Sequence, residues 1–412
     1  MNDFSQKKHN NNCTNSNSVC FYVVFMGKLP TTFDEWVANF ELWRENVGFD
    51  AKWAGDFELK PLFDWERAGD VIEFGDYAGR PKWERSLQIP HQNIRDSLLS
   101  MITVQGDTEF ASVEQQKHLL ESAPTDYDRY AAARIMVEEQ RHGWQMCYLL
   151  MTYFGKQGAR EAQKLLERNA QTGSRLLGAF NEPMEHWLDF FCYTMFVDRD
   201  GKFQLGMLST SSFKPLAASM GPMLKEEAFH LGTGANGLRR IIKANVIPRD
   251  LLQRYMNKWV STAHDLFGTD NSSSAEWAYV WGIKGRWDER KKLKKGEEVN
   301  KLGLNEESRG HYHDEIVREV EEKFNKLISE DETPFYVADE KFNRSIGTYA
   351  GKKYTVEGDE WGDEDGSYDE YCQKFLPTDE DEELLKELFK KEWIEHRAVT
   401  QRMIDSGIGQ LQ

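Results

Sequence analysis

Two Glu-x-x-His steps, Glu139-Gln-Arg-His142 and Glu227-Ala-Phe-His230, each lie inside a long stretch of helical pattern. Residues three apart share one face of a helix, so the carboxylate and the imidazole of each step can bind the same metal ion. Two such steps that face each other, completed by one acid from each of two further helices, form the four-helix di-iron carboxylate site. Among ten histidines, about one Glu three residues before a His is expected by chance. The alternative is therefore a pair of Glu/His contacts on solvated helix faces, and the surrounding sequence has to decide.

Hydrophobic periodicity, together with caps and helix breakers, predicts four long helices between residues 92 and 243. No alternation of strands and helices competes with this pattern, so the sequence predicts an all-α fold built on a four-helix bundle. Additional helices flank the bundle, and the C-terminal extension is expected to be partly irregular, with a solvated segment at 285–312. The predicted helices span about 33–47, 92–121, 125–154, 159–169, 183–208, 215 or 222 to 243, 248–267, 313–329 and 379–403.

The composition excludes several classes of protein. With 412 residues and a formal net charge of −17, the chain is unsuited to nucleic acid or to an anionic membrane surface. Five scattered cysteines indicate no disulfide framework, so a cytoplasmic location is expected, with Cys147 and Cys192 in the core. The apolar run at 20–26 is too short to span a bilayer and lacks the flanks of a signal peptide. Three parts are expected: a disordered leader at 1–25, a helical metal-binding domain with its lead-in at 26–284, and an extension packing on the bundle at 285–412.

Two more acids are needed, one from the first and one from the third long helix. Glu109 lies 30 residues before Glu139, which suits antiparallel helices joined by a short turn, and its neighbours at helical spacing are small, apolar or uncharged. Asp107 is the weaker alternative. In the third helix, Asp198 and Asp200 follow an aromatic and apolar run, where an acid is costly unless a charge meets it. Periodicity mildly favours Asp198, and the alternative is a helix-breaking Asp-Arg-Asp-Gly turn.

Several polar residues beside these acids have more than one interpretation. Glu138 and Glu226 lie four residues before the two histidines, so spacing alone leaves them as rival ligands or as partners of an imidazole N–H. Glu114 and His118 are four apart and are expected to form a surface pair. Gln105 lies one turn before the first acid and either contacts substrate or oxygen or serves packing.

The segment GTGANG at 232–237 matches the spacing of a dinucleotide-binding fingerprint, but a helix precedes it where that motif requires a strand. We therefore reject the fingerprint and expect these small residues to admit a neighbouring helix or the substrate. Since no flavin, nicotinamide or iron–sulfur motif is found, the chain is expected to bind no organic cofactor. Arg239, Arg240 and Lys243 follow this segment and either hold an anionic substrate or form an ordinary solvated face.

Several longer strings carry a more specific signal: QGDTEFASVEQQKHL, VEEQRHGWQMCYLLMTYFG, LLGAFNEP, VDRDGKFQL and MLKEEAFHLGTG. They resemble the oxygenase component of benzoyl-CoA 2,3-epoxidase, a family of ferritin-like di-iron proteins related to the phenylacetyl-CoA ring epoxidases. The resemblance is strong over about 95–245, weaker at 340–351 and poor before residue 90. It implies a ferritin-like four-helix bundle and, position by position, six iron ligands: Glu109, Glu139, His142, Asp198, Glu227 and His230.

The sequence departs from the family pattern in its shorter length, a trimmed loop at 170–175, an unrelated N-terminus, and Phe110 where Pro is expected. These departures leave the ligand set intact and bear on the identity of the acyl group. Carboxylate and imidazole ligands suit iron or manganese, and four carboxylates balance the charge of two ferrous ions.

The resemblance implies an O2-dependent di-iron monooxygenase that epoxidises the ring of an aryl-CoA thioester, converting benzoyl-CoA to 2,3-epoxybenzoyl-CoA. The implied cofactors are two iron ions, with O2 as co-substrate. The implied partner is a separate NADPH-dependent reductase that carries flavin and iron–sulfur groups. Two alternatives stay open: a related di-iron or Mn/Fe oxygenase with another substrate such as phenylacetyl-CoA, and a non-catalytic metal-binding bundle.

Overall fold

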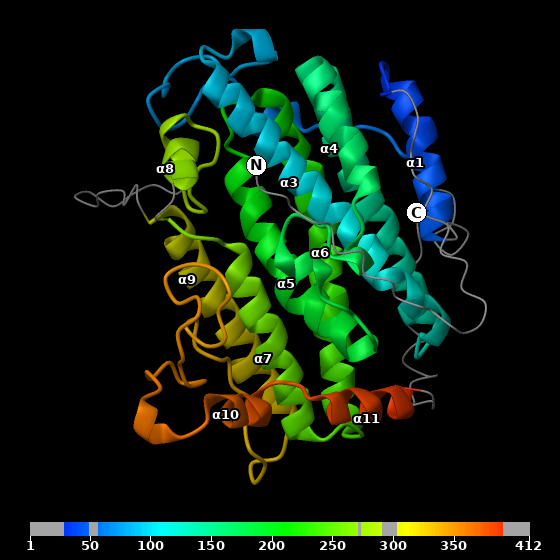
Figure 1. Ribbon diagram of the computed structural model, residues 1–412, viewed down its shortest axis with the longest axis vertical. Helices are drawn as coiled ribbons and strands as arrows, with labels where there is room; N and C mark the ends of the chain where they lie inside the picture. The colour runs from blue at the N-terminus through cyan, green and yellow to red at the C-terminus, as the bar shows by residue number, and fades with distance from the viewer. Residues whose placement is uncertain (1–28, 49–56, 271–272, 291–302, 390–412) are drawn as a thin grey trace, which may run out of the picture.

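The computed structural model describes residues 29–48, 57–270, 273–290 and 303–389. The predicted leader, with Cys13 and Cys20, lies outside these ranges, and so does the final part of the helix predicted at 379–403. Four long helices form the centre of the molecule (Figure 1): α3 (Gln92–Gln116), α4 (Asp126–Glu167), α5 (Trp187–Leu208) and α6 (Lys214–Ala244). α3 packs along α4, and α5 packs along α6. Within the described residues, β-structure is limited to isolated bridges, so the predicted all-α class is confirmed.

Local signals explain where these helices begin and end. Thr32 caps α1 (Phe33–Val47) through a capping box with Glu35. The helices predicted at 125–154 and 159–169 are continuous in α4 but kinked at Gly155, whose φ of 56° and ψ of −136° are not helical. α5 begins at Trp187, later than the predicted start at 183, because the His186 side chain accepts the Asp189 N–H and caps the helix there.

Further helices enclose the bundle. α1 lies beside α4 (Figure 1), where the Trp36 indole donates to the Ala162 carbonyl oxygen at 3.0 Å. α2 (Trp65–Ala68) packs on α6, and α7 (Arg249–Leu266) packs on α5. The fully buried Cys147 and Cys192 lie in the core, as predicted. None of the described helices combines the length and the hydrophobicity that crossing a bilayer requires.

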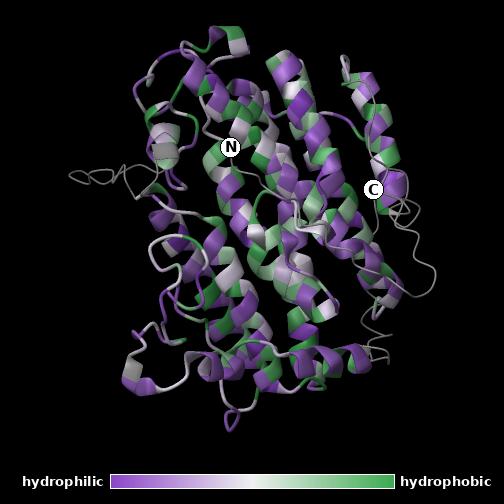
Figure 2. Ribbon diagram, viewed as in Figure 1, coloured by the Kyte–Doolittle hydropathy of each residue, from purple (hydrophilic) through white to green (hydrophobic). Residues whose placement is uncertain are grey.

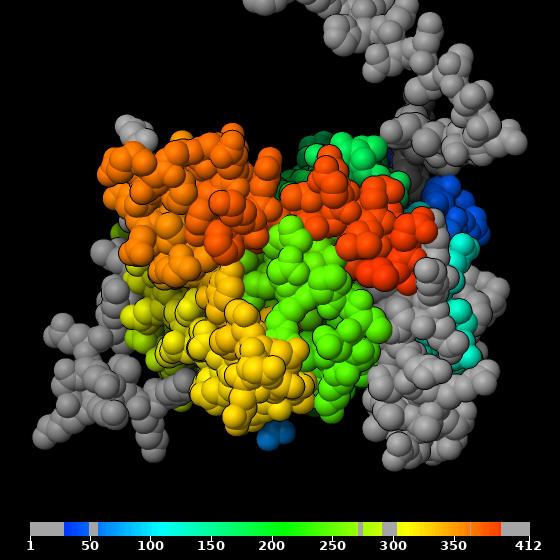
Figure 3. All heavy atoms as spheres, turned by 90° about the horizontal axis from the view of Figure 1, so that it is seen from below, coloured from blue at the N-terminus to red at the C-terminus, as the bar shows by residue number. Residues whose placement is uncertain are grey.

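The C-terminal third corrects two predictions. α9 (Leu304–Val317) begins inside the segment predicted to be solvated, because Leu304 and Tyr312 are buried there, and it continues as a π-helix over Arg318–Phe324. A short helix, α10 (Tyr368–Phe375), lies in the region predicted to be irregular. α8 (Ser273–Val280) packs near α9. α10 and α11 (Asp379–Phe389) are largely hydrophilic (Figure 2) and, with the preceding C-terminal residues, cover much of the lower end of the bundle (Figure 3).

Candidate metal centre

The structure brings all six predicted ligands together in the middle of the bundle, and every one of them is buried. Five of them fall into two overlapping groups, Glu109 with Glu139 and His142, and Glu139 with Asp198 and His230, and within each group the carboxylate and imidazole atoms lie within 4.8 Å of one another. Glu139 belongs to both groups. The sixth, Glu227, lies within 4 Å of both imidazoles. The six side chains come from α3 (Glu109), α4 (Glu139, His142), α5 (Asp198) and α6 (Glu227, His230).

Two carboxylates lie between the two imidazoles. Glu139 places Oε2 3.9 Å from Nδ1 of His142 and Oε1 3.3 Å from Nδ1 of His230. Glu227 places Oε1 3.8 Å from Nδ1 of His142 and Oε2 3.4 Å from Nδ1 of His230. Each of these carboxylates therefore presents one oxygen to each half of the site, which is the geometry of a bridging carboxylate.

The other two acids each face one half only. Glu109 Oε2 lies 3.2 Å from Nδ1 of His142, and Asp198 Oδ2 lies 3.8 Å from Nδ1 of His230. The two imidazole ring centres are 6.1 Å apart. Each half of the site thus combines one histidine, one acid of its own and a share of two common carboxylates.

The neighbouring glutamates hold the outer side of each imidazole, and they do so across the bundle. Nε2 of His142, on α4, lies 2.7 Å from Oε2 of Glu226 on α6. Nε2 of His230, on α6, lies 3.0 Å from Oε2 of Glu138 on α4. Arg141 also binds Glu226. A carboxylate that accepts the Nε2 proton leaves the lone pair on Nδ1 available inside the site, and the contacts of Glu226 and Glu138 suit this role as partners of an imidazole.

Burial and mutual repulsion dominate the electrostatics of the cluster. Burial, followed by the Glu109 charge, holds the pKa of Glu139 well above its usual range, and burial with Glu227 does the same for the pKa of Asp198. Burial alone would lower the pKa of His142, but its carboxylate neighbours raise it to about 9. Without added positive charge, such a cluster keeps protons on its ligands, and divalent cations would replace them.

Unsatisfied polar atoms show that the cluster fits such cations. Asp198 Oδ2, Glu227 Oε2 and His230 Nδ1 are buried and make no hydrogen bond. Such atoms are rare in folded proteins because each costs the free energy of its lost hydration. All three point into the same half of the site, and oxygen with imidazole nitrogen is the ligand chemistry of iron and manganese.

A family model described as phenylacetic acid catabolic protein matches residues 84–314, more than half of the chain. The chain belongs to the phenylacetic acid catabolic protein family. It is 38% identical over 284 residues to benzoyl-CoA oxygenase component B of Aromatoleum evansii, which covers 62% of this chain and 59% of that protein. It is 25% identical over 194 residues to one of the subunits of the 1,2-phenylacetyl-CoA epoxidase of Escherichia coli, covering 46% of this chain and 60% of that protein. The chain thus spans about three fifths of the length of these relatives. The predicted family and its ferritin-like fold are confirmed.

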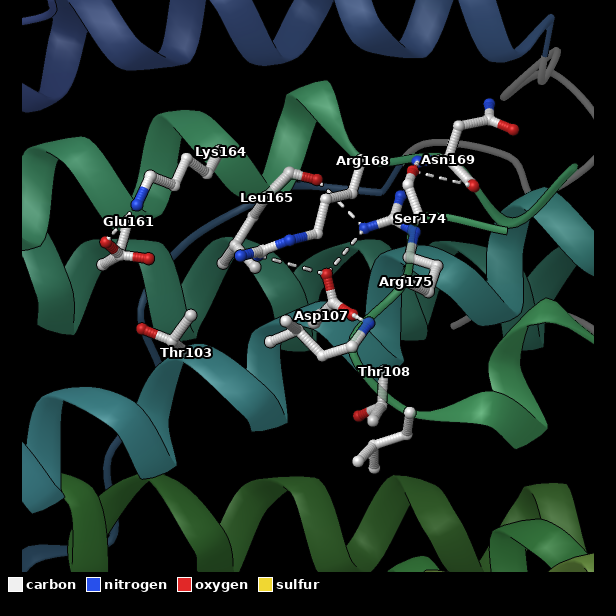
Figure 4. Close-up of polar contacts among 12 residues, drawn as sticks. Thr103, Asp107, Thr108, Glu161, Lys164, Leu165, Arg168, Asn169, Ser174 and Arg175 are labelled. Carbon is white, nitrogen blue, oxygen red and sulfur yellow. Dashed lines mark hydrogen bonds and ion pairs between the residues drawn. The ribbon is translucent and has the colours of Figure 1, made fainter. Parts of the chain in front are cut away.

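In this member of the phenylacetic acid catabolic family, Asp107, the weaker candidate for the acid on the first long helix, has a structural role. Asp107 is buried and accepts a hydrogen bond from Arg175 at 3.1 Å (Figure 4). It also accepts from the backbone N–H of Leu176 at 2.7 Å. The predicted surface pair of Glu114 and His118 is wrong, because Glu114 is buried and accepts from Arg175 at 2.7 Å. Periodicity missed this because Arg175 lies in a loop about 60 residues later.

The structure also shows the roles of the small residues at 232–237 and of the basic residues that follow them. Gly234 and Gly237 admit α5: a Cβ on Gly234 would lie 2.5 Å from the Met195 nitrogen, so these small residues serve helix packing, as predicted. Arg240 is not on a solvated face, because it forms a buried ion pair with Asp128. Arg239 pairs with Glu319 at 3.1 Å. Of the three basic residues, Lys243 is the exposed one.

A cavity of about 380 Å³ opens beside the cluster, and Glu109, Glu139, Asp198 and Glu227 line its inner end. Gln105 also lines it and donates to Glu109 at 2.6 Å, so this side chain orients the Glu109 carboxylate. Its other lining residues are mostly apolar side chains of α3 and α5 and of the segment between α4 and α5: Met101, Val104, Leu177, Phe180, Val197, Leu205 and Leu208.

One lining residue near the cluster was not anticipated from the sequence. Tyr193 is buried on α5, and burial together with the Asp198 charge raises the pKa of its phenol well above its usual range. It therefore stays protonated and can donate a hydrogen bond at the edge of the site. No local pattern distinguishes it from the surrounding aromatic residues of α5.

Proposed function

We propose that this protein is an O2-dependent di-iron oxygenase that epoxidises the aromatic ring of an aryl-CoA thioester, namely benzoyl-CoA to 2,3-epoxybenzoyl-CoA. The observation that carries the proposal is the pair of carboxylates, Glu139 and Glu227, each shared between two imidazoles at the closed end of a mostly apolar cavity. The similarity to benzoyl-CoA oxygenase component B supports the choice of substrate.

The chain's own residues have distinct roles in this proposal. Glu109 and His142 would hold one iron ion, Asp198 and His230 the other, and the two shared glutamates would bridge them. Two ferrous ions supply the pair of electrons that ground-state O2 needs for reaction with a closed-shell ring. Burial of these ligands excludes bulk water from the place where oxygen reacts.

The outer glutamates and the cavity position the reactants. Glu138 and Glu226 fix the tautomer and the orientation of the two imidazoles through their Nε2 atoms. The apolar walls of the cavity suit an aromatic ring, which loses no hydrogen bond on entering. One oxygen atom enters the ring as the epoxide and the other leaves as water, formed with two protons and the two electrons that the ferrous ions would supply. A separate NADPH-dependent reductase would return these two electrons to the iron ions before the next turnover. The name "component B" indicates that the relative is one part of a multi-component oxygenase.

Metal analysis tests the centre itself. After anaerobic loading with Fe(II), the protein should hold two iron ions per chain, and His230→Ala should hold one and lose activity while keeping its helical circular dichroism. His311→Ala, which changes an exposed histidine on α9, is the matched control and should behave as wild type. Wild-type turnover by His230→Ala would contradict the ligand assignment.

A panel of thioesters tests the substrate. Single-turnover reactions of the reduced protein with O2 and benzoyl-CoA should yield an oxygenated benzoyl product. Turnover of phenylacetyl-CoA without turnover of benzoyl-CoA would instead favour the activity named for the second relative. Two bound iron ions without turnover of any thioester would leave a non-catalytic metal-binding bundle.

A further inference from the structure

The cavity beside the metal centre is long and narrow. On α3 its lining runs from Ser112 back to Ser97, fifteen residues, or roughly 22 Å at the rise of an α-helix, and Glu109 lies near the Ser112 end. On α5 it runs from Tyr193 forward to Leu208, also fifteen residues, and Asp198 lies towards the Tyr193 end. The two helices therefore run in opposite directions along the same channel, with the ligand carboxylates nearer to one end.

Part-way along this channel, the lining includes one acid, one amide and one cation, a group that we call the amide clamp: Asp200, Gln204 and Lys284. Gln204 lies six residues after Asp198 on α5, or roughly 9 Å further along the helix axis. Its Nε2 donates to Oδ1 of Asp200 at 2.9 Å, which orients that carboxylate. Asp200 is itself buried.

Lys284 comes from a different segment, after α8, and the surrounding backbone holds it firmly. Its backbone N–H donates to the Ala278 carbonyl oxygen at 3.1 Å, and the next residue, Gly285, donates to the Met207 carbonyl oxygen at 3.2 Å. Gly285 is tightly packed, since a Cβ there would lie 2.3 Å from Oγ1 of Thr210. The Lys284 ammonium reaches a cavity whose other described lining residues include no cation.

The carboxylate of Asp200 and the ammonium of Lys284 do not neutralise each other. Asp200 and Lys284 form no ion pair with each other within 4 Å, although both line the cavity; Lys284 instead donates to Oδ1 of Asn305 at 3.2 Å. A buried carboxylate and a partly buried ammonium that line one cavity without an ion pair between them are costly unless a ligand joins them. The ligand that fits needs one donor and one acceptor close together.

We infer that the amide clamp binds an amide of the substrate's thioester arm, with Asp200 accepting its N–H and Lys284 donating to its carbonyl oxygen. This inference rests on the proposed aryl-thioester substrate and names the residues that position it. In such a thioester the first amide nitrogen of the cysteamine unit lies roughly 7 Å from the ring, five bonds away. With the ring beside Asp198, that amide reaches the level of Gln204.

The clamp can be tested by binding alone, without O2 and hence without turnover. The anaerobic Fe(II)-loaded protein is titrated calorimetrically with S-benzoyl-N-acetylcysteamine, which has the amide, and with S-butyl thiobenzoate, which lacks it. Lys284→Met should weaken binding of the first about tenfold, the effect of losing one hydrogen bond from a charged donor, and leave the second unchanged. Lys164→Met, which removes an exposed cation that pairs with Glu161, is the matched control and should change neither.

A second variant distinguishes the loss of the clamp from a general loss of structure. Gln204→Leu should also weaken only the amide-bearing thioester, because the Asp200 carboxylate loses the donor that orients it. Equal affinity of wild type, Lys284→Met and Gln204→Leu for S-benzoyl-N-acetylcysteamine overturns the clamp, while turnover of benzoyl-CoA would still support the proposed activity. Equal weakening of both thioesters also overturns it. Failure of every thioester to bind and react overturns the clamp and the proposed activity together.

Discussion

Glu226→Gln should weaken one metal position and spare the other. Oε2 of Glu226 lies 2.7 Å from Nε2 of His142 and also binds Arg141. Burial alone would raise the pKa of Glu226, but His142 and Arg141 lower it to about 2, so this group is a carboxylate at neutral pH. The substitution keeps the shape of the side chain and a neutral acceptor, and it removes only the negative charge.

The size of the effect follows from the contact that changes. A hydrogen bond to a charged acceptor contributes about 1.5–3 kcal/mol, against about 1 kcal/mol for a neutral one. The difference of roughly 1–2 kcal/mol corresponds to about a 5–30-fold loss of affinity, within the range found when outer partners of metal-binding histidines are changed. Only the ion beside His142 should lose this affinity, because Glu138 holds the other imidazole.

Anaerobic Fe(II) titration in competition with a chelator measures both positions. Wild type should show two binding steps, and Glu226→Gln should weaken one of them. Glu138→Gln should weaken the other step, and the double variant should weaken both. Glu66→Gln, an exposed acid on α2, is the matched control. Equal weakening of both steps in Glu226→Gln, or no weakening at all, would refute the assignment of one outer glutamate to each histidine.

Three further predictions concern stability, each measured by urea unfolding. Gly234→Ala should destabilise the fold by several kcal/mol, because its Cβ would lie 2.5 Å from the Met195 backbone nitrogen. Gly232→Ala is the control: its Cβ would meet nothing within 4 Å, so it should be neutral or stabilise by up to about 1 kcal/mol. Equal effects of the two variants would contradict the close packing at Gly234. Arg175→Met removes the ion pair of the buried Glu114 and one of the two ion pairs of the buried Asp107, which keeps Arg168, and it should cost about 3–5 kcal/mol. A loss below 1 kcal/mol would show that Arg175 is not their buried partner. Burial lowers the pKa of Lys82 to about 8 from a usual 10.5, so between these pH values the unfolded chain binds more protons than the folded one. The free energy of unfolding of wild type, relative to that of Lys82→Met, should therefore rise by up to about 3 kcal/mol from pH 8 to pH 10.5. A relative free energy of unfolding that stays flat or falls over this range would contradict the prediction.

The sequence alone was sufficient for features that depend on neighbours along the chain. Helical periodicity, caps and helix breakers located the bundle helices, and the Glu-x-x-His spacing placed Glu139 and Glu227 beside their histidines. These features are local because backbone hydrogen bonding and the 3.6-residue repeat act within a few residues. The helix predicted to end before Gly155 instead continues through a kink at that residue. The resemblance to a family then distinguished Asp198 from Asp200, which periodicity had only ranked.

Contacts between distant segments were decided by tertiary structure. Glu226 pairs with His142 and Glu138 with His230 across the bundle, which no spacing within one helix could reveal. Asp107 and Glu109, two residues apart, point to different sides of α3, since that spacing is roughly 200° around a helix. Lys284 reaches the cavity from a segment with no periodic pattern. In each case the partner lies far along the chain, and only packing of the helices determines which side chains meet.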